Sequence, residues 1–392
     1  MNDPKREKSK SSNTPKSVTI PRIPIKDKAI NENSFRDWEF LESYLNGHSP
    51  SGNESEGQKI WETYMDKELI DKTKFTNSHG NLVYTIPRTD WIGSSNLPYP
   101  KVLIEAHCDE VSYIITKIGN DGLIYVVRNG GSDEAIAPSK KVLIHTKLGK
   151  LSGVFGWVAI HIRDRNIVPD RNSIFIDAGF DSKESAIKAG IEVGNFVTYD
   201  EKCFILNDKI VGKSLDNKLG GYVISQVAKR FQNIEDRKFD LIISNSVQEE
   251  VGLLGAKMLM HNVNPDLAIV TDVTHDTNVP TMKNNLLGDI ACGRGPVVVR
   301  GAAIDPYIES HIKNYFDKPY QLQACSGRGT GTDADEISYS NGGVPTALIK
   351  FPLRYMHTTT EMCNIKDVND TIDLIYETLV YLNNDTYSWF KK

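Results

Sequence analysis

Two adjacent glutamates, Glu249 and Glu250, follow the apolar run FDLIIS and precede the segment GLLGAKMLM. The run is short, β-branched and bounded by charge, which predicts a buried strand, and the following segment has helical spacing. A strand that ends in two neighbouring carboxylates places like charges side by side at a sheet edge, where they repel. Such a pair suits chemistry in which one carboxylate binds a cation and the other takes a proton from water.

Histidine and aspartate side chains stand at other places where a predicted strand ends. The segments and their residues are KVLIEA with His107, VGKSL with Asp216, DLAIVT with Asp272, and ALIKFPLRYM with His357. Taken singly, each has a structural explanation, a helix cap for an aspartate or a packed position for a histidine. Sites in open α/β sheets form at the carboxyl ends of strands, so five segments that deliver such residues there predict one shared site.

The mixture of ligand types indicates a transition-metal site. Imidazole with carboxylate suits zinc, cobalt or manganese better than calcium, which prefers oxygen ligands alone. Two histidines with three carboxylates exceed the three protein ligands of a single catalytic zinc, and fit two metals ~3.5–4 Å apart with one bridging carboxylate. Residues two apart on a strand face the same side, so Asp109 can accept the second ring N–H of His107. The two cations would offset the charge of the glutamate pair.

The elements that position these residues divide the chain into parts. Residues 1–34 are polar and basic, and we expect a solvated, disordered tail. Alternating strands and helices over 35–110 and 207–392 predict one catalytic α/β domain. Between them, residues 111–206 carry six short β-rich runs with glycine turns, interrupted by the helical patch SKESAIKAG. The runs are SYIITKI, GLIYVVR, KKVLIHTKL, KLSGVFGWVAIHI, NSIFIDA and NFVTYD. This pattern of short strands and turns predicts a small β-barrel or sandwich domain inserted into the α/β domain.

Composition excludes several classes of function. The net charge of −5 offers no basic excess for nucleic acid. No apolar stretch approaches the ~20 residues that span a bilayer, and no apolar h-region follows the basic start, so we expect neither a membrane protein nor a secreted one. The five cysteines are scattered and contain no CxxC pair, which favours reduced thiols and a cytoplasmic location.

The chain resembles the tetrahedral, or glutamyl, aminopeptidases, a branch of the dinuclear-metal exopeptidases. The matching stretches are IEAHCDEVSYIITKIG, GKSLDNKLGGYV, VQEEVGLLGAK, IVTDVTHDTNVP and TGTDADEISYSNGGVPTALIKFPLRYMHTTTEM. They occur in the family's order, and the resemblance runs from about residue 35 to 385. It implies a zinc-peptidase-like α/β sandwich with an inserted small β-barrel domain. That insert would mediate assembly of a homo-oligomer, commonly a hollow dodecamer, and the substrates would be peptides.

Residue by residue, the resemblance implies roles for the predicted site. The implied metal ligands are Asp216 as the bridge, His107 and Asp272 for one ion, and Glu250 and His357 for the other. Glu249 would be the general base, and Asp109 would support His107. The cofactors would be two divalent ions, zinc in the first place, with cobalt or manganese as alternatives. The implied reaction is hydrolysis of N-terminal residues from peptides by a water that two metals activate.

Two alternatives come from other classes of protein. A cellulase-like glycosidase also uses paired carboxylates, but its acid and base stand ~5–9.5 Å apart around a sugar, which adjacent glutamates do not suit. A non-catalytic scaffold stabilised by metal is the second alternative, and the presence of every ligand and the base disfavours it. Asp333, in GTGTDADE, has two interpretations, a residue that lines the substrate site or a turn residue that caps the following helix.

Overall fold

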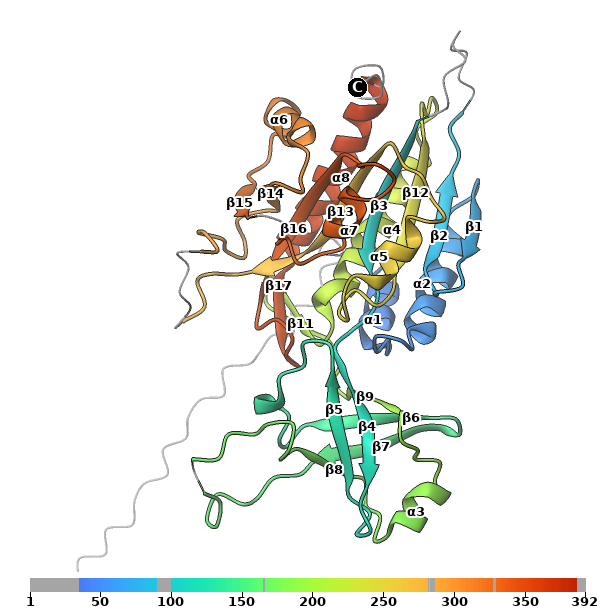
Figure 1. Ribbon diagram of the computed structural model, residues 1–392. Coiled ribbons are helices and arrows are strands. Elements are labelled where there is room, and N and C mark those ends of the chain that lie inside the picture. Colours follow the sequence, from blue (N-terminus) through green and yellow to red (C-terminus); the bar gives the residue numbers. More distant parts are fainter. Residues whose placement is uncertain are drawn as a thin grey trace, which may run out of the picture.

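The computed structural model of the chain describes residues 35–89, 100–164, 166–280, 282, 286–326 and 329–385. The tail predicted over residues 1–34 lies outside these ranges. A large α/β unit stands above a smaller closed β-barrel, and the two are joined where β3 continues into β4 (Figure 1). The predicted fold class, an α/β sandwich with an inserted barrel, is confirmed.

Eleven strands of the described chain form the large sheet. The main path, in spatial order, is β1 (Thr73–Thr76), β2 (Leu82–Ile86), β12 (Asp240–Ser246), β3 (Lys101–His107), β13 (Leu267–His275), β16 (Thr346–Arg354), β17 (Glu361–Asn364), β11 (Lys209–Gly212) and β10 (Phe204–Leu206). β14 (Val297–Gly301) pairs with β16 and with β15 (Gln321–Cys325). The central strands β12, β3, β13 and β16 run parallel, so their carboxyl ends meet at one edge.

Helices cover both faces of the central strands. One face carries α1 (Trp38–Asn46), α2 (Ser55–Glu68), α4 (Leu215–Phe231) and α8 (Ile365–Asn384), with α6 (Pro306–Tyr315) beside α8, and the other carries α5 (Leu254–Leu259) and α7 (Ala334–Ser338). Along β3, Val102 and Ile104 pack into the larger core while Leu103 packs into the core under α5 and α7. This alternation explains the continuous apolar run of the strand, because both of its faces are buried.

The barrel closes with six strands and has a hydrophobic core of its own. Its strands, in spatial order, are β4 (Ser112–Ile118), β5 (Ile124–Asn129), β8 (Phe175–Asp177), β7 (Gly149–Phe155), β6 (Lys141–Thr146) and β9 (Phe196–Tyr199). The short helix α3 (Lys183–Lys188) precedes β9, in the helical patch predicted for this region, and Ser182 caps it. The six predicted β-rich runs thus supply the six strands of the barrel.

Two predictions about this region need correction. The boundary at residue 206 is wrong, because β10 pairs with β11 through a tight turn at Asn207 and belongs to the large sheet. The barrel therefore ends with β9. The run KLSGVFGWVAIHI forms a strand only as far as Phe155, since the three-residue β8 pairs with Val154 and Phe155 and ends at Phe175, whose carbonyl O accepts the N–H of Gly156.

The barrel contacts the large unit through side-chain hydrogen bonds. The amide of Asn129 donates to the carbonyl O of Ser51 at 2.8 Å, and His48 Nδ1 lies 2.8 Å from Thr198 Oγ1. Both contacts involve the loop between α1 and α2, so this loop fixes the barrel against the edge where the parallel strands end.

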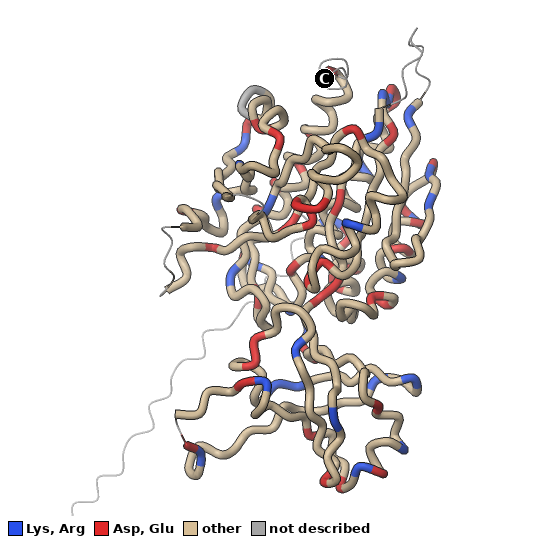
Figure 2. The backbone as a smooth tube through the Cα atoms, in the orientation of Figure 1, with Lys and Arg blue, Asp and Glu red and all other residues tan. Residues whose placement is uncertain are grey.

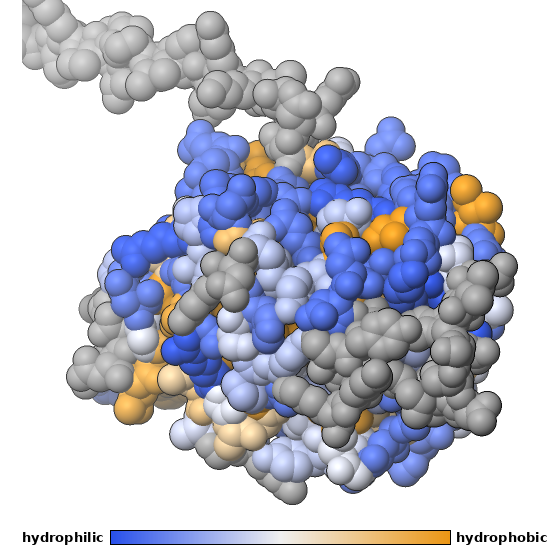
Figure 3. All heavy atoms as spheres, turned by 90° about the horizontal axis from the view of Figure 1, so that it is seen from above, coloured by the Kyte–Doolittle hydropathy of each residue, from blue (hydrophilic) through white to orange (hydrophobic). Residues whose placement is uncertain are grey.

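The surface and the cysteines add two observations. Seen from the end opposite the barrel, the molecule is mostly hydrophilic, with apolar side chains in separate patches (Figure 3). No helix of the described ranges combines the length and apolar character needed to cross a membrane. All five cysteines fall within these ranges and are free thiols.

Candidate active site

The residues singled out from the sequence converge at the carboxyl edge of the parallel strands. Those residues are His107, Asp109, Asp216, Glu249, Glu250, Asp272 and His357. Acidic segments from distant parts of the chain meet in the lower half of the large unit, above the barrel (Figure 2). His107 ends β3, Asp272 lies in β13, and the glutamate pair follows β12. The topology therefore brings one side chain after another to the same rim.

Asp216 lies between the two histidines. Its Oδ1 is 3.3 Å from His107 Nε2, and its Oδ2 is 3.4 Å from His357 Nε2. Asp216 stands near the start of α4, where its backbone and that of Asn217 are not helical. This interruption turns the carboxylate away from the helix axis, so that each of its oxygens faces a different imidazole.

Two groups of potential ligand atoms form around Asp216. In one group, His107 Nε2 lies 3.8 Å from Asp272 Oδ1 and 3.8 Å from Glu249 Oε2. In the other group, His357 Nε2 lies 3.3 Å from Glu250 Oε1 and close to Asp216. Within each group the ligand atoms lie within 4.8 Å of one another. Each imidazole thus faces carboxylate oxygens with the same ring nitrogen, Nε2.

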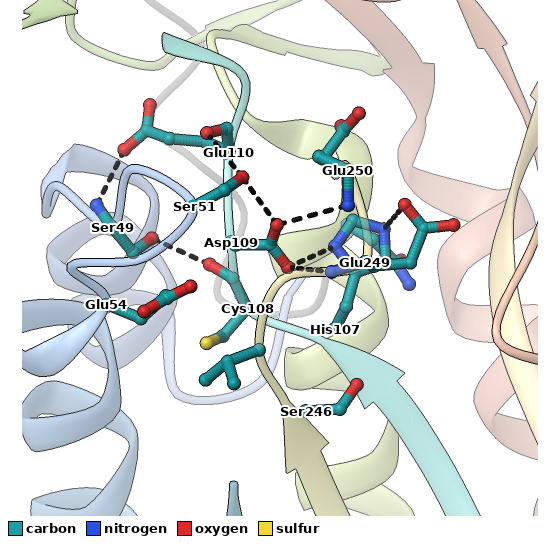
Figure 4. A network of polar contacts seen from close by, with 12 residues as sticks. Ser49, Ser51, Glu54, His107, Cys108, Asp109, Glu110, Ser246, Glu249 and Glu250 are labelled. Atoms are coloured by element: carbon teal, nitrogen blue, oxygen red, sulfur yellow. Dashed lines mark hydrogen bonds and ion pairs between the residues drawn. The ribbon is translucent and has the colours of Figure 1, made fainter. Parts of the chain in front are cut away.

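Asp109 connects His107 to the glutamate pair (Figure 4). Its Oδ1 is 3.4 Å from His107 Nδ1, and its two oxygens accept the backbone N–H groups of Glu249 at 3.0 Å and Glu250 at 3.2 Å. The hydroxyl of Ser51 donates to Asp109 Oδ2 at 2.6 Å. Because Asp109 is fully buried, these contacts set both the orientation of the His107 ring and the position of the following turn.

The turn that presents the two glutamates is tightly built. Gln248 has a positive φ of 55°, and the chain then bends back toward α5. Gly255 faces this turn so closely that a Cβ there would lie 1.9 Å from the carbonyl O of Val247. Glycine is therefore required for close approach, and the packing holds the side chains of Glu249 and Glu250 over the strand ends.

Burial and mutual repulsion shift the titration of the cluster. Burial raises the pKa of Asp272 to about 7, and the charge of Asp216 adds to this shift. Burial also raises the pKa of Glu249 and that of Glu250. For His357, burial opposes the charged form, but Asp216 and Glu250 raise its pKa to about 11. In the metal-free protein, protonated imidazoles balance part of this negative charge, and bound cations would take their place because only neutral imidazole ligates a metal.

The donor set fits divalent cations. No Lys or Arg in the described ranges forms an ion pair with Asp216, Glu249, Glu250 or Asp272, although all four are buried or nearly so. Buried carboxylates need a positive partner, and here the only ion-pair partners are two histidines, which also ligate metals. Zinc, cobalt and manganese accept this mixture of nitrogen and oxygen donors.

Sequence reasoning missed the buried residue Glu361, although it had quoted its segment. The Glu361 carboxylate accepts the backbone N–H of His357 at 2.8 Å and that of Asp216 at 3.2 Å. Glu361 lies four residues after His357, at the start of β17. Its other partner, Asp216 near the start of α4, is far away in the sequence. In the sequence, Glu361 is a glutamate in the polar stretch HTTTEM, and this local pattern does not distinguish it from a surface residue.

Asp333 does not act as a helix cap. It precedes α7, but its side chain makes no capping hydrogen bond and instead accepts from the hydroxyl of Ser246 at 2.8 Å. The hydroxyl of Ser246 also hydrogen-bonds the buried carboxyl group of Glu105, which lies two residues before His107 in β3. The interpretation as a helix cap is therefore wrong, and Asp333 belongs to a polar layer beneath the site.

The site opens toward the barrel. A pocket there is lined by Glu250 and His357 on one side and by Glu110, Val111 and Tyr199 on the other. Tyr199 ends β9, so the barrel contributes directly to the wall of the opening. The ligand group of Asp216, Glu250 and His357 therefore borders this junction between the two units.

Comparison with known proteins agrees with this geometry. The model of the M42 glutamyl aminopeptidase family matches residues 92–374. The lysyl aminopeptidase of Pyrococcus furiosus is 29% identical over 346 residues, which cover 86% of this chain and 95% of that protein. The TET aminopeptidase of the marine sediment archaeon Thaumarchaeota archaeon SCGC AB-539-E09 superposes with a TM-score of 0.80 at 26% identity, and covers 92% of this chain and 99% of its own.

A further solved structure shares the fold. Pyrococcus horikoshii TET1 peptidase, which can assemble into a tetrahedron or a large octahedral shell, has a TM-score of 0.73 at 24% identity, over 87% of this chain and 98% of its own. The family match spans well over half of the chain and includes every predicted ligand. The chain belongs to the M42 glutamyl aminopeptidase family and is a metal-dependent aminopeptidase.

Proposed function

We propose that the site holds two divalent cations and that Asp216 bridges them. One ion would be held by His107, Asp216 and Asp272, and the other by Asp216, Glu250 and His357. The position of Asp216 carries this proposal, because its two oxygens lie 3.3 and 3.4 Å from two different imidazoles. With this bridge, each ion has three protein ligands, the number that leaves a catalytic ion open to water and substrate.

Glu249 is the remaining carboxylate, and we assign it the role of general base. Its Oε2 lies 3.8 Å from His107 Nε2 within the first ligand group, but with Asp216 as the bridge that ion would have three ligands without Glu249. Two cations at this site would lower the pKa of water toward ~7 and polarise the scissile carbonyl. Glu249 takes the proton from the attacking water and delivers it to the leaving amine. Asp109 holds the ring of His107 in the orientation that points Nε2 at the site.

The open position on each ion favours substrates with a free amine. With three protein ligands, each ion would have room for a further donor, and the neutral N-terminal amine of a peptide is such a donor. A chain that enters from the junction with the barrel would place its first residue at the ligand groups, which restricts hydrolysis to the N-terminal peptide bond. Peptides rather than folded proteins are the proposed substrates.

We propose zinc as the resident metal, with cobalt or manganese as replacements. The two-histidine, three-carboxylate donor set is compatible with all three ions, and availability in the cell selects among them. A cellulase-like glycosidase is not favoured, because the family match is to peptidases and the paired glutamates adjoin histidines rather than a groove between separated carboxylates. A non-catalytic scaffold is not favoured either, since no ligand is missing.

We propose that the barrel, the larger part of the inserted residues 111–206, mediates assembly into a homo-oligomer of twelve chains. The segment that follows β7 carries exposed apolar side chains, among them Val158, Ile160 and Ile162 at 50%, 56% and 80% exposure. Apolar side chains grouped in this way mark contact surfaces. Closed tetrahedral symmetry relates twelve identical chains, and P. horikoshii TET1 peptidase can form a tetrahedron. The free thiols support a cytoplasmic location.

Elemental analysis and a substrate panel test the proposed function together. Metal-saturated protein should contain two divalent ions per chain and should hydrolyse aminoacyl amides that have a free amine, but not their N-acetylated counterparts. Dialysis against a chelator should abolish the activity, and zinc, cobalt or manganese should restore it. One ion per chain would contradict the bridge, and hydrolysis of a cellulose-type substrate after chelation would support the glycosidase alternative. Light scattering of a stable monomer at micromolar concentration would contradict the assembly.

A further inference from the structure

A buried lysine lies beside the ligand group of His107 and Asp272 (the first group). β13 and β16 are parallel, and their register aligns Lys350 with Asp272. Aligned residues of neighbouring strands point to the same face, and such strands lie about 4.8 Å apart. Two residues earlier on this face, Val270 and Leu348 pack into the core under α5 and α7. Lys350 therefore shares the inner side of the sheet with Asp272, and it is 6% exposed.

The ammonium group of Lys350 has no anionic partner within the described ranges. Its one hydrogen-bond acceptor there is the carbonyl O of Thr330, 3.5 Å from Nζ. It forms no ion pair with Asp272, whose carboxylate faces His107 instead, although its charge acts on Asp272 through space. Salt screens a buried charge only weakly. Lys350 thus adds an uncompensated positive charge beside a carboxylate that is proposed to bind metal.

The other buried lysines near the site are compensated. Lys213 Nζ lies 2.7 Å from Glu110 Oε2, and Lys218 Nζ lies 3.2 Å from Glu110 Oε1. Burial alone would raise the pKa of Glu110, but these two lysines lower it, so the carboxylate stays charged. Lys350 differs from both, since no carboxylate of the described chain is bonded to it.

The first group contains one carboxylate more than the group of Glu250 and His357 (the second group). His107 Nε2 faces Asp216, Asp272 and also Glu249, at 3.3, 3.8 and 3.8 Å. Among the described residues, His357 Nε2 forms ion pairs only with Asp216 and Glu250. The additional carboxylate would attract a cation more strongly into the first group than into the second. The charge of Lys350 lies on the side of this surplus and opposes it.

We propose that Lys350 lowers the affinity of the first group for divalent cations and so keeps the ion of that group exchangeable, despite the additional carboxylate. This inference rests on the proposed function, because it assumes that one ion is held by His107, Asp216 and Asp272. Like charges repel over several ångströms in a poorly screened interior, so an ammonium group beside Asp272 disfavours a cation bound there. Lys350 supplies no ligand atom and acts through its charge alone.

Zinc affinities of single-site variants test this role on metal-free, full-length protein. His357→Ala removes the imidazole of the second group and leaves the first group intact, whereas His107→Ala does the reverse. In the His357→Ala protein, Lys350→Met should raise the zinc affinity at least about tenfold, because it removes a buried unit charge and keeps the length of the side chain. In the His107→Ala protein, the same substitution should change the affinity less than about twofold, since the charge lies beside the other group. Competition with a chelator of known zinc affinity measures both values without reference to activity.

Further variants separate charge from shape. Lys350→Arg keeps the positive charge and should leave the zinc affinity of the His357→Ala protein within about threefold. Lys350→Gln keeps a donor for the carbonyl O of Thr330, should show the same gain as Lys350→Met, and tests the inference if the methionine variant does not fold. Lys59→Met removes a lysine whose side chain is 72% exposed on α2 and should have no effect.

The affinities also give clear contrary results. An unchanged zinc affinity of the His357→Ala protein after its buried ammonium group is removed overturns the inference. An equal gain in the His357→Ala and His107→Ala proteins overturns it as well, because the effect would then not be local to the first group. Wild-type protein that binds fewer than two ions per chain would instead overturn the proposed function.

Discussion

Gly131 lies against the imidazole of His357, and a Cβ at position 131 would come within 2.5 Å of the ring atom Nδ1. Gly131 is the second residue after the end of β5, so the backbone that leaves this barrel strand contacts a residue of the large unit. The neighbouring Gly130 approaches the carbonyl O of Glu250 in the same way, at 3.2 Å from an added Cβ. The barrel is therefore part of the wall that positions the ligand group of Glu250 and His357.

Gly131→Ala should displace the His357 ring and weaken the second metal site. The added methyl group leaves no room for the present ring position, and misplacing a ligand typically costs about 10–100-fold in metal affinity or activity. Metal content should fall from two ions toward one under limiting zinc, with kcat/KM reduced. Gly149→Ala, at a turn of the barrel with open space around it but a φ of 126° that strains an alanine, controls for general backbone strain and should keep both ions. Unchanged metal binding in Gly131→Ala would show that the ring has another position available.

Glu361→Leu should weaken the support of the ligand group that contains Glu250 and His357. It leaves the buried N–H groups of Asp216 and His357 without their acceptor, and each buried unsatisfied group costs about 1–3 kcal/mol. Denaturant unfolding should therefore show a loss of at least this size, and the second ion should bind more weakly. Glu192→Leu, at a half-exposed position in the barrel, should change stability by no more than about 0.5 kcal/mol. Full stability of Glu361→Leu would mean that water replaces the carboxylate.

The histidines His48 and His145 should make the junction with the barrel sensitive to acid. Both rings lie 2.8 Å from Thr198 Oγ1. Burial, and to a smaller extent the charge of Lys213, lowers the pKa of His48 to about 2. Burial, and to a smaller extent the charge of Lys150, lowers the pKa of His145 to about 4. Because the unfolded chain binds these protons first, near pH 6.5, stability should fall as the pH drops below that value, by about 1.4 kcal/mol per pH unit for each histidine.

This pH dependence is measured on metal-free protein, so that loss of metal does not contribute. Between pH 6.5 and 5, the free energy of unfolding should fall by about 2 kcal/mol less in His48→Asn than in the wild type, since asparagine keeps a polar partner for Thr198 without titrating. His161→Asn, at an exposed position of the barrel, should show the same change of unfolding free energy with pH as the wild type. Equal slopes in the wild type and His48→Asn would mean that His48 is protonated in the folded protein.

The sequence predicted what depends on local pattern. The alternation of helices and strands in the large unit and the six strands of the barrel follow from periodicity and glycine turns. Because parallel strands share one carboxyl edge, the residues at their ends could be predicted to meet without knowledge of the strand order. The fold class and the convergence of these side chains thus rest on information within each segment.

What the sequence did not predict depends on contacts between distant segments. Glu361 is distinguished by the N–H group of a residue 145 positions away, and Gly131 by a ring from the other unit. The end of the barrel was misplaced because the short run FIL pairs with the strand that follows it rather than with the strands before it.

Glu249 and Glu250 are neighbours with different contacts, and their glutamine variants should behave differently. Glu250 Oε1 lies 3.3 Å from His357 Nε2 within a ligand group, so Glu250→Gln replaces a charged ligand with a neutral amide and should weaken binding of one ion. Glu249→Gln should keep both ions and lower kcat by about 10²–10⁴-fold, because it removes the group that transfers the proton. Its KM should change little, since ground-state binding is not affected.

Metal content and kcat measured on the same preparations decide between the two roles. Both variants keep the backbone N–H groups that bond to Asp109, so each serves as the structural control for the other. Loss of an ion from Glu249→Gln with retention of both in Glu250→Gln would reverse the roles, an arrangement that the 3.8 Å approach of Glu249 to His107 makes geometrically feasible. If both variants hydrolyse peptides at near wild-type rates, the pair is structural, and the proton must pass through another group.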